Sequence, residues 1–490
     1  MQSHEKTPLF TGLIKHIENN PVPFHIPGHK NGRGMDKTFR DFIGENTLAI
    51  DLINIAPLDD LHHPSGMIKE AEALAADAFG AEYTFFSVQG TSSPIMAMVL
   101  SVCRPGDKII VPRNIHKSVT SALIFSGAIP IFVHPELDTE LGIAHGITPI
   151  SVEHAIQQHP DAKAVFVINP TYYGVSADLK HIVDIAHSHG IPVLVDEAHG
   201  VHIHFHEDLP VSAMAAGADL AATSVHKLGG SMTGSSVLNG RTGFVNKERV
   251  QTVLSMLTTT STSYVLLASL DVSRKYLKTQ GYDRLSETIT YANRLRQQIN
   301  ALDYLYCPGS EILGTDATFD YDPTKILVSV KQLGLTGYDV EKWLRLHYNI
   351  EVELSDMYNI LCIITPGDSK ETINLLLMAL SELVRTYSKD ATERTVQVSH
   401  PPIPTLAMSP RDAFYAEIEV IPLKASANRI SAESIMIYPP GIPIFIPGEI
   451  ITTESLDYIE ANVEAGLPVQ GLEDETLETI HVIKEMHAIT

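Results

Sequence analysis

The amino-acid sequence predicts an α/β protein built around a mostly parallel β-sheet. Between residues 68 and 240, short apolar runs alternate with helical stretches. Such runs between turn signals are typical of strands buried on both faces, and strands that alternate with helices form a parallel sheet covered by helices. Ligands of these sheets bind at the carboxyl ends of the strands. Chemically informative residues are therefore expected where the strands end.

The expected strands are YTFFSV (83–88), KIIVP (108–112), PIFVH (130–134), AVFVI (164–168), PVLVDE (192–197) and LAATS (220–224). Helices are expected at 92–102, 118–125, 179–189 and 264–300.

Four parts follow from these patterns. Residues 1–45 hold one helical stretch and the turn-rich PVPFHIPGHKNGRG, which predicts an arm without regular structure after the helix. A large domain is expected at 46–300 and a smaller α+β domain at 301–390. A proline-rich linker then begins a C-terminal domain at 391–490.

Composition excludes several classes of function. The 490 residues carry 35 Lys and Arg against 58 Asp and Glu, a net charge of −23, which disfavours nucleic acid and favours cationic small molecules as partners. The three cysteines form no CxxC pair, so neither a thiolate zinc site nor a disulfide framework is expected. No apolar run is long enough to cross a bilayer, and a cytoplasmic location is expected.

A first chemical signal follows the strand 83–88. Gly90, Thr91 and Ser92 form a glycine turn with hydroxyl groups at the start of a helix. Free backbone N–H groups and the helix dipole favour a phosphate there. An ordinary helix N-cap is the alternative.

A second signal is Asp196, which follows the apolar run 192–195 directly. An isolated carboxylate at a buried strand end is costly, so it needs a partner, and a protonated ring nitrogen would serve. The alternative is a structural aspartate that caps the next turn.

A third signal is Lys227, in Ser224-Val225-His226-Lys227-Leu228-Gly229-Gly230. Desolvation would lower the pKa of a lysine beside a buried strand and make it a nucleophilic amine, as Schiff-base chemistry requires. The alternative is a lysine that extends to solvent.

One cofactor explains all three signals. Pyridoxal phosphate requires a phosphate cradle, a carboxylate for its ring nitrogen and a lysine for its aldehyde. These groups occur in chain order on strand ends, and Lys227 lies 31 positions after Asp196.

The chain also resembles the fold-type-I, aspartate-aminotransferase-like enzymes that use this cofactor, and specifically the Orn/Lys/Arg decarboxylase family. Within it, the short biosynthetic arginine decarboxylases of Gram-positive bacteria are most similar. The resemblance covers nearly the whole chain and rests on FHIPGHKNG, SVQGTSS, PRNIHKS, INPTYYG, VDEAHG, TSVHKLGG, TSTSY and YPPGIPIFIPGE.

The resemblance implies a role for each matching residue. Lys227 would hold the cofactor covalently, Asp196 would pair with its ring nitrogen, and His116 would stack on its ring. Thr91, Ser92, Ser224 and His226 would bind the phosphate beside Gly90, and His199 would lie near the ring. Thr262, in the segment 260–263, would reach the cofactor of a neighbouring subunit, which implies a homodimer or a higher homo-oligomer.

The implied reaction is decarboxylation of L-arginine to agmatine in polyamine biosynthesis. His226 and Lys227 are both candidates for the acid that protonates Cα. The far cation of the substrate requires a carboxylate, for which Glu433 and Asp60 are candidates, and Glu449 is a weaker one. Lysine or ornithine remains an alternative substrate, because nothing in the residues themselves selects arginine.

A different class of function is suggested by His202, His204 and His206. If these histidines alternate on one face of a strand, they could bind zinc and make the protein a metallohydrolase. A polar strand face is the simpler interpretation, and no metal is expected. Another pyridoxal-phosphate enzyme, such as an aminotransferase, is a further alternative.

Overall fold

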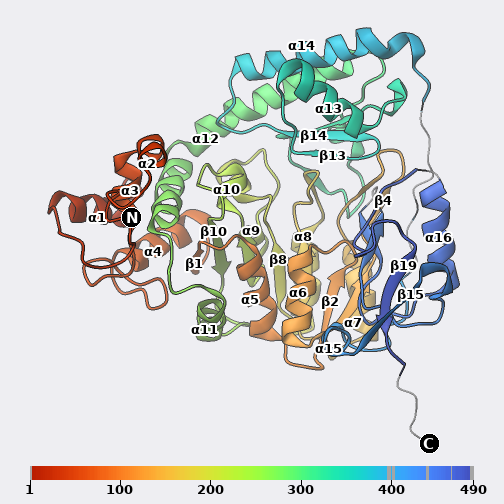
Figure 1. The fold of residues 1–490 in the computed structure, drawn as a ribbon, viewed down its shortest axis with the longest axis horizontal. Coiled ribbons are helices and arrows are strands. Elements are labelled where there is room, and N and C mark those ends of the chain that lie inside the picture. The colour runs from red at the N-terminus through yellow and green to blue at the C-terminus, as the bar shows by residue number, and fades with distance from the viewer. Residues whose placement is uncertain (1–2, 394–398, 400–402, 438–440, 465, 486–490) are drawn as a thin grey trace, which may run out of the picture. The chain divides into compact units, whose positions relative to one another are not determined.

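The computed structural model describes residues 3–393, 399, 403–437, 441–464 and 466–485 (Figure 1). The chain forms two compact units. The first combines Met1–Ser101 with Pro192–Leu285, and the second combines Val102–Ile191 with Ser286–Thr490. Among the described residues, no helix has both the length and the apolar character needed to cross a membrane.

Four strands of the first unit lie in the order β1 (Tyr83–Ser87), β10 (Ser236–Gly240), β9 (Leu220–Thr223) and β8 (Val193–Asp196). β8 and β9 are parallel, whereas β10 is antiparallel to both β9 and β1. All residues of the four strands are buried. β1, β9 and β8 therefore end at the edge where β10 begins.

The helices of the first unit begin and end at clear signals. The Asp59 carboxylate accepts hydrogen bonds from the backbone N–H groups of Gly66 and Ile68 at the start of α4, which ends at Gly80 in a left-handed conformation. The helices are α1 (Pro8–Glu18), α2 (Lys37–Ile43), α3 (Glu45–Ile50), α4 (Met67–Phe79), α5 (Ser92–Val102), η1 (Val201–Phe205), α9 (Ala213–Ala216), α10 (Val225–Leu228) and α11 (Lys247–Leu257).

Three strands of the second unit are parallel, in the order β6 (Val165–Ile168), β2 (Lys108–Pro112) and β3 (Ile129–Val133). They alternate with α6 (Lys117–Ser126), α7 (Pro149–Gln158) and α8 (Leu179–Ser188). The prediction of an α/β fold with a mostly parallel sheet is confirmed, and β10 is the strand that runs against its neighbours.

The helix α12 (Tyr264–Asn300) leads to a three-stranded antiparallel sheet of the second unit, in the order β12 (Lys325–Ser329), β14 (Asn359–Ile363) and β13 (Leu354–Ser355). Successive residues of β12 face opposite sides, as expected of a strand. Ile326 and Val328 pack with Trp343 of α13 (Gly337–Tyr348) and with α14 (Lys370–Tyr387).

On the other side of this sheet, Leu327 and Leu361 pack with Leu141 and Ile143. These two residues belong to the hairpin of β4 (Leu137–Asp138) and β5 (Ile143–Ala144). The hairpin, which the sequence did not predict, therefore lies against the small sheet.

The C-terminal part of the second unit has its own apolar cluster, which includes Ile435, Phe445 and Ile459. Its elements are α15 (Pro410–Tyr415), β15 (Ile418–Pro422), η5 (Leu423–Ala425), β16 (Ile435–Ile437), β17 (Ile442–Phe445), α16 (Thr453–Glu464), β18 (Val469–Gln470) and β19 (Thr479–Ile483). Residues 438–440 of the motif YPPGIP lie outside the described residues.

The remaining short elements all belong to the second unit. They are β7 (Val175–Ser176), η2 (Ser310–Ile312), β11 (Asp320–Tyr321), η3 (Lys331–Leu333) and η4 (Ser388–Asp390).

Candidate active site

Three hydroxyl groups meet at one edge of the strands of the first unit. The Thr91 hydroxyl makes a short hydrogen bond with the Ser224 hydroxyl and lies 2.9 Å from that of Ser236. All three residues are buried. Thr91 precedes α5, Ser224 follows β9 and Ser236 begins β10, so we call these residues the hydroxyl cluster.

The hydroxyl cluster lies beside the N-terminus of α5, which begins at Ser92. Gly90 has φ +70°, a left-handed conformation that glycine adopts without strain, and a Cβ there would meet nothing within 4 Å. Neutral hydroxyls beside a helix N-terminus can donate hydrogen bonds to an anion, as a phosphate cradle requires.

Ser236 is a member of the cluster that the sequence did not reveal. Functional residues of a parallel sheet are expected at strand ends, but Ser236 stands at the start of its strand. Because β10 is antiparallel, its first residue reaches the edge where β1 and β9 end.

Asp196 is the last residue of β8 and is buried. Its Oδ1 accepts a hydrogen bond from the backbone N–H of Ala198 at 3.1 Å. Burial raises the pKa of Asp196 to about 6, although the Ala198 N–H and the charge of Lys227 favour the carboxylate. This site therefore favours a close cation, such as a protonated ring nitrogen.

Lys227 lies in α10, and its Nζ is 2.7 Å from Nε2 of His199. An ammonium group only donates hydrogen bonds, so Nε2 of His199 accepts the hydrogen bond from Lys227. The ring proton of neutral His199 then lies on Nδ1. The expected burial of Lys227 is wrong for the single chain, in which Lys227 is exposed. Its neighbours Val225 and Leu228 are buried instead, because the helical turn directs Lys227 away from the core.

His226 is fixed by the loop that precedes β10. Its Nδ1 is 2.8 Å from the carbonyl oxygen of Ser235, which also accepts the backbone N–H of His226. Since a carbonyl oxygen only accepts, Nδ1 carries a proton and Nε2 is the nitrogen left for another contact.

His116 belongs to the second unit, where it caps the N-terminus of α6. Its Nδ1 accepts a hydrogen bond from the backbone N–H of Ser118 at 3.2 Å. Thr262 is buried in the segment between α11 and α12 of the first unit. The roles of both residues toward a cofactor remain predictions.

The acidic residues considered for substrate binding differ in their contacts. Asp60 is half-buried, and its Oδ1 accepts the backbone N–H of His62 at 3.0 Å. Glu433 accepts the backbone N–H groups of Glu473 and His481, one on each oxygen. A substrate role for Asp60 or Glu433 remains a prediction.

Glu449 has a structural partner. Its two oxygens lie 2.6 and 2.8 Å from the guanidinium of Arg113, and both residues are fully buried. Arg113 also donates to the carbonyl groups of Pro443 and Ile444. This bidentate pair accounts for both oxygens of Glu449, so its candidacy as a substrate ligand is wrong.

The three histidines of the zinc hypothesis do not lie on a strand. His202 and His204 belong to the 3-10 helix η1, and His206 follows it. His204 faces an acceptor with each ring nitrogen, the carbonyl oxygen of Phe79 at 3.1 Å and the carboxylate of Glu197 at 2.7 Å. Both ring nitrogens of His204 are therefore engaged by protein oxygens, which disfavours His204 as a metal ligand.

Among the described residues, candidate metal ligands gather at Glu433, Glu473 and His481, a group that includes none of these three histidines.

Comparison with known proteins identifies the family of the chain. A family model described as Orn/Lys/Arg decarboxylase, major domain, matches residues 7–372, and one described as Orn/Lys/Arg decarboxylase, C-terminal domain, matches residues 391–483. The chain belongs to the Orn/Lys/Arg decarboxylase family. The predicted family is thereby confirmed.

Individual members of this family differ in their similarity to the chain. The arginine decarboxylase of Bacillus subtilis (strain 168) is 65% identical over 490 residues, which cover 100% of this chain and 100% of that protein. The lysine decarboxylase LdcA of Pseudomonas aeruginosa is 27% identical, and the aligned region covers 92% of this chain and 75% of LdcA.

The crystal structure of the Francisella novicida lysine decarboxylase LdcF has the same fold. It superimposes with a TM-score of 0.86 at 24% identity and covers 98% of this chain and 81% of that one.

Proposed function

We propose that this member of the Orn/Lys/Arg decarboxylase family uses pyridoxal phosphate to decarboxylate L-arginine to agmatine and carbon dioxide in polyamine biosynthesis. The observation that carries this choice of substrate is the 65% identity to an arginine decarboxylase over the whole chain, against 27% for a lysine decarboxylase. Decarboxylation of lysine or ornithine is the alternative.

The site of the first unit fits the cofactor. Lys227 supplies the amine that would bind its aldehyde, and the hydroxyl cluster with the N-terminus of α5 would hold its phosphate. Asp196 is a buried carboxylate that a ring cation would stabilise. Bound pyridoxal phosphate supplies an electron sink for the carboxylate bond that breaks.

His199 and His226 would handle protons in this proposal. The Nε2 atom of His199 can hold the proton of Lys227 and leave a nucleophilic amine. His226 is fixed through Nδ1, so its Nε2 can hold a proton on the side away from Ser235. Both His226 and Lys227 are therefore candidates for the proton that Cα receives.

The other contacts that we propose follow the family resemblance. His116 would stack on the cofactor ring, and Thr262 would reach the cofactor of a neighbouring subunit. Asp60 and Glu433 are candidates to pair with the guanidinium of the substrate, for which a carboxylate is the complementary group.

We also propose a cytoplasmic homodimer or higher homo-oligomer. Cys103, Cys307 and Cys362 are free and buried, which fits a reducing compartment. The first unit exposes apolar residues of the arm that follows α1, namely Val22 at 74%, Phe24 at 94% and Ile26 at 60%. Such a patch is unusual on a monomer and suits an interface. The four domains at 1–45, 46–300, 301–390 and 391–490 remain our proposed organisation.

The substrate is tested by incubating the enzyme separately with arginine, lysine and ornithine and identifying the amines by mass spectrometry. We expect agmatine from arginine, and a kcat/KM for the other two that is lower by on the order of a hundredfold. Cadaverine or putrescine as the main product would contradict the choice of arginine, whereas a keto acid would contradict decarboxylation.

The attachment of the cofactor is tested with Lys227→Ala. We expect this variant to lose the visible absorbance of covalently bound pyridoxal phosphate and to lose turnover. Lys247→Ala is a matched control, because Lys247 is an exposed lysine of the same unit at the start of α11. Full activity of Lys227→Ala would refute the assignment.

A further inference from the structure

The second unit contains a cavity outside the proposed active site. Its volume is about 370 Å³, within the range of small-molecule sites. The hairpin β4–β5, the chain after α12 and the end of β12 all contribute to it. Its polar lining residues are Asp138, Glu140, Tyr306, Ser329, Lys331 and Gln332.

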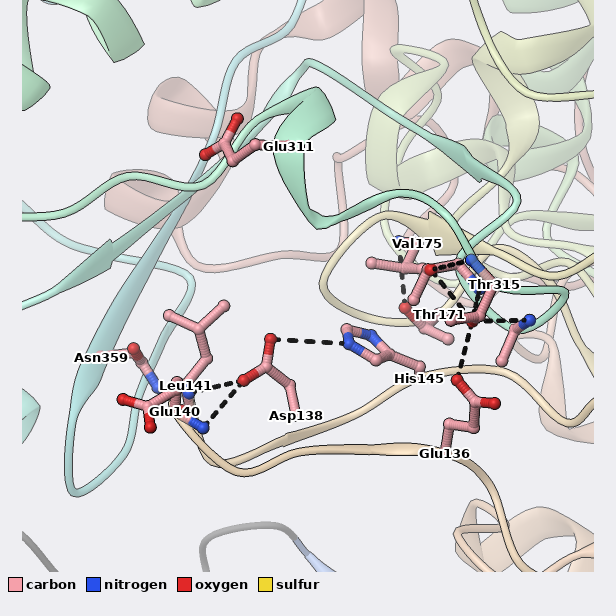
Figure 2. A network of polar contacts seen from close by, with 12 residues as sticks. Glu136, Asp138, Glu140, Leu141, His145, Thr171, Val175, Glu311, Thr315 and Asn359 are labelled. Atoms are coloured by element: carbon pink, nitrogen blue, oxygen red, sulfur yellow. Dashed lines mark hydrogen bonds and ion pairs between the residues drawn. The ribbon is translucent and has the colours of Figure 1, made fainter.

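Asp138 supplies negative charge to this cavity (Figure 2). Its Oδ1 accepts the backbone N–H groups of Glu140 and Leu141, both at 2.9 Å. Burial alone would raise the pKa of Asp138, but these N–H groups and the neighbouring His145 hold it below its usual value. Its Oδ2 lies 3.7 Å from Nε2 of His145, beyond hydrogen-bond distance, and can therefore accept from a closer donor.

Lys331 is the cation in the lining, and its charge is already paired. Its Nζ donates to the carboxylate of Glu140 at 2.9 Å and to the backbone carbonyl of the same residue at 3.0 Å. It also lies 3.9 Å from the carboxylate of Glu393. Lys331 therefore does not neutralise Asp138, whose nearest basic group is His145 at 3.7 Å, and has little capacity for an anion.

Ser329 provides a second acceptor. It is 3% exposed, and its Oγ has no hydrogen-bond partner among the described residues. Buried hydroxyls are rarely left unpaired, since the loss of water is then uncompensated.

Tyr306 provides a third acceptor. Its hydroxyl donates to Glu311 at 2.8 Å, which leaves the lone pairs of the phenol oxygen to accept.

We propose that this cavity binds a small linear amine, with an ammonium or guanidinium group at Asp138, Ser329 and Tyr306. Such a group is a cation with several donors, which matches a lining that offers a carboxylate and two accepting hydroxyls. The apolar side chains of Leu141 and Ile312 also line the cavity and suit the methylene chain of the ligand. This site goes beyond the reaction and is independent of the proposed substrate.

Binding would connect parts of the second unit that meet at the small sheet. Asp138 belongs to the hairpin whose Leu141 packs against Leu327, and Ser329 ends the strand that carries Leu327. An amine that contacts both Asp138 and Ser329 therefore stabilises this packing, and it should raise the temperature of unfolding.

The test is isothermal titration calorimetry of the holoenzyme with agmatine and with 1,5-diaminopentane, with inorganic phosphate as the anion control. An amine also binds at the active site, so the cavity should appear as an additional stoichiometric site. We expect Asp138→Asn and Ser329→Ala to weaken that site by about tenfold or more. Lys331→Met should strengthen it, because a positive charge in the lining that repels the ligand is removed and the carboxylate of Glu140 is released.

Ser176→Ala is the matched control, because Ser176 is also a buried serine of the second unit whose hydroxyl has no partner among the described residues. The Ser176→Ala variant should bind the amine with the same affinity as the wild type. Ser329→Ala removes no existing hydrogen bond, so it remains informative if Asp138→Asn fails to fold. The proposal is overturned if neither cavity variant changes amine binding, or if phosphate binds and Lys331→Met abolishes that binding.

Discussion

Two buried carboxylates of this chain have different partners. Glu449 is matched by the guanidinium of Arg113, which satisfies both of its oxygens within the protein. Asp196 has the backbone N–H of Ala198 and the more distant charge of Lys227. Burial without a matched cation is costly, so Asp196 lowers the stability of the cofactor-free chain, as our proposal that it pairs with a ring cation would require.

This difference predicts a pH dependence of stability in the cofactor-free protein. The pKa of Asp196 is raised from 3.8 to about 6, so between these pH values the folded state holds a proton that the unfolded chain has lost. The free energy of unfolding should therefore fall as pH rises through this range, by about 3 kcal/mol from Asp196.

We expect cofactor-free Asp196→Asn to lack this contribution and to be more stable than the wild type at pH 7, but not at pH 4. Urea unfolding of both proteins at several pH values measures the difference. If the free energy of unfolding depended on pH in the same way in both proteins, the prediction would be contradicted.

At the scale of elements, the edge of the sheet collects side chains from separate strands and loops. The hydroxyl cluster joins the chain before α5, the end of β9 and the start of β10. Backbone hydrogen bonds between neighbouring strands hold the buried strands in place. We therefore expect these hydroxyls to keep fixed positions before any ligand binds.

Ser236→Ala should weaken the affinity for pyridoxal phosphate by about tenfold while the strand remains intact, because the Ser236 hydroxyl, which donates to the Thr223 carbonyl oxygen, no longer holds the Thr91 hydroxyl in place. Ser101→Ala is the control, since Ser101 lies on α5 and its hydroxyl donates to the Ala97 carbonyl oxygen of the same helix. Equilibrium titration of the cofactor-free proteins, followed by absorbance, measures both affinities. Equal affinity of Ser236→Ala and the wild type would exclude Ser236 from the cradle.

The Arg113–Glu449 pair joins the chain after β2 to the chain after β17. Glu449→Ala leaves a fully buried guanidinium without its carboxylate, and such a change costs about 3–5 kcal/mol. The double variant with Arg113→Met should recover much of this loss, since no buried charge remains. Thermal unfolding of the single and double variants is the measurement, and a double variant no more stable than Glu449→Ala would contradict the argument.

The elements that the sequence predicted well are those with strong local signals. The helix expected at 92–102 is found at Ser92–Val102, and the long helix at Tyr264–Asn300. The strand β10 was missed because SVLNG contains asparagine and glycine, and pairing with β1 and β9 makes it a strand. The conformation of the segment His202–His206 could not be predicted either, because its buried contacts come from distant residues such as Phe79.

At the scale of the whole molecule, the charge of −23 keeps subunits apart unless an apolar surface compensates. The arm after α1 offers such a surface at Val22, Phe24 and Ile26. These residues lie in the proline-rich segment that the sequence predicted to be without regular structure.

Phe24→Asp should shift the enzyme toward monomers, because it places a charge in the proposed apolar interface. Phe414→Asp is a matched control, since Phe414 is also an exposed phenylalanine, at 61%, on α15 of the second unit. Sedimentation velocity of both variants measures the change. An unchanged oligomer in Phe24→Asp would exclude the arm as the contact between subunits.

The antiparallel course of β10 has a consequence for how this site can vary. Ser224, Lys227 and Ser236 lie within one short segment, which turns back on itself and is closed by the contact of His226 with Ser235. The length of this segment therefore sets where the amine lies relative to the hydroxyls. Active relatives should tolerate exchanges of the exposed side chains Met232 and Thr233 far better than a single inserted or deleted residue.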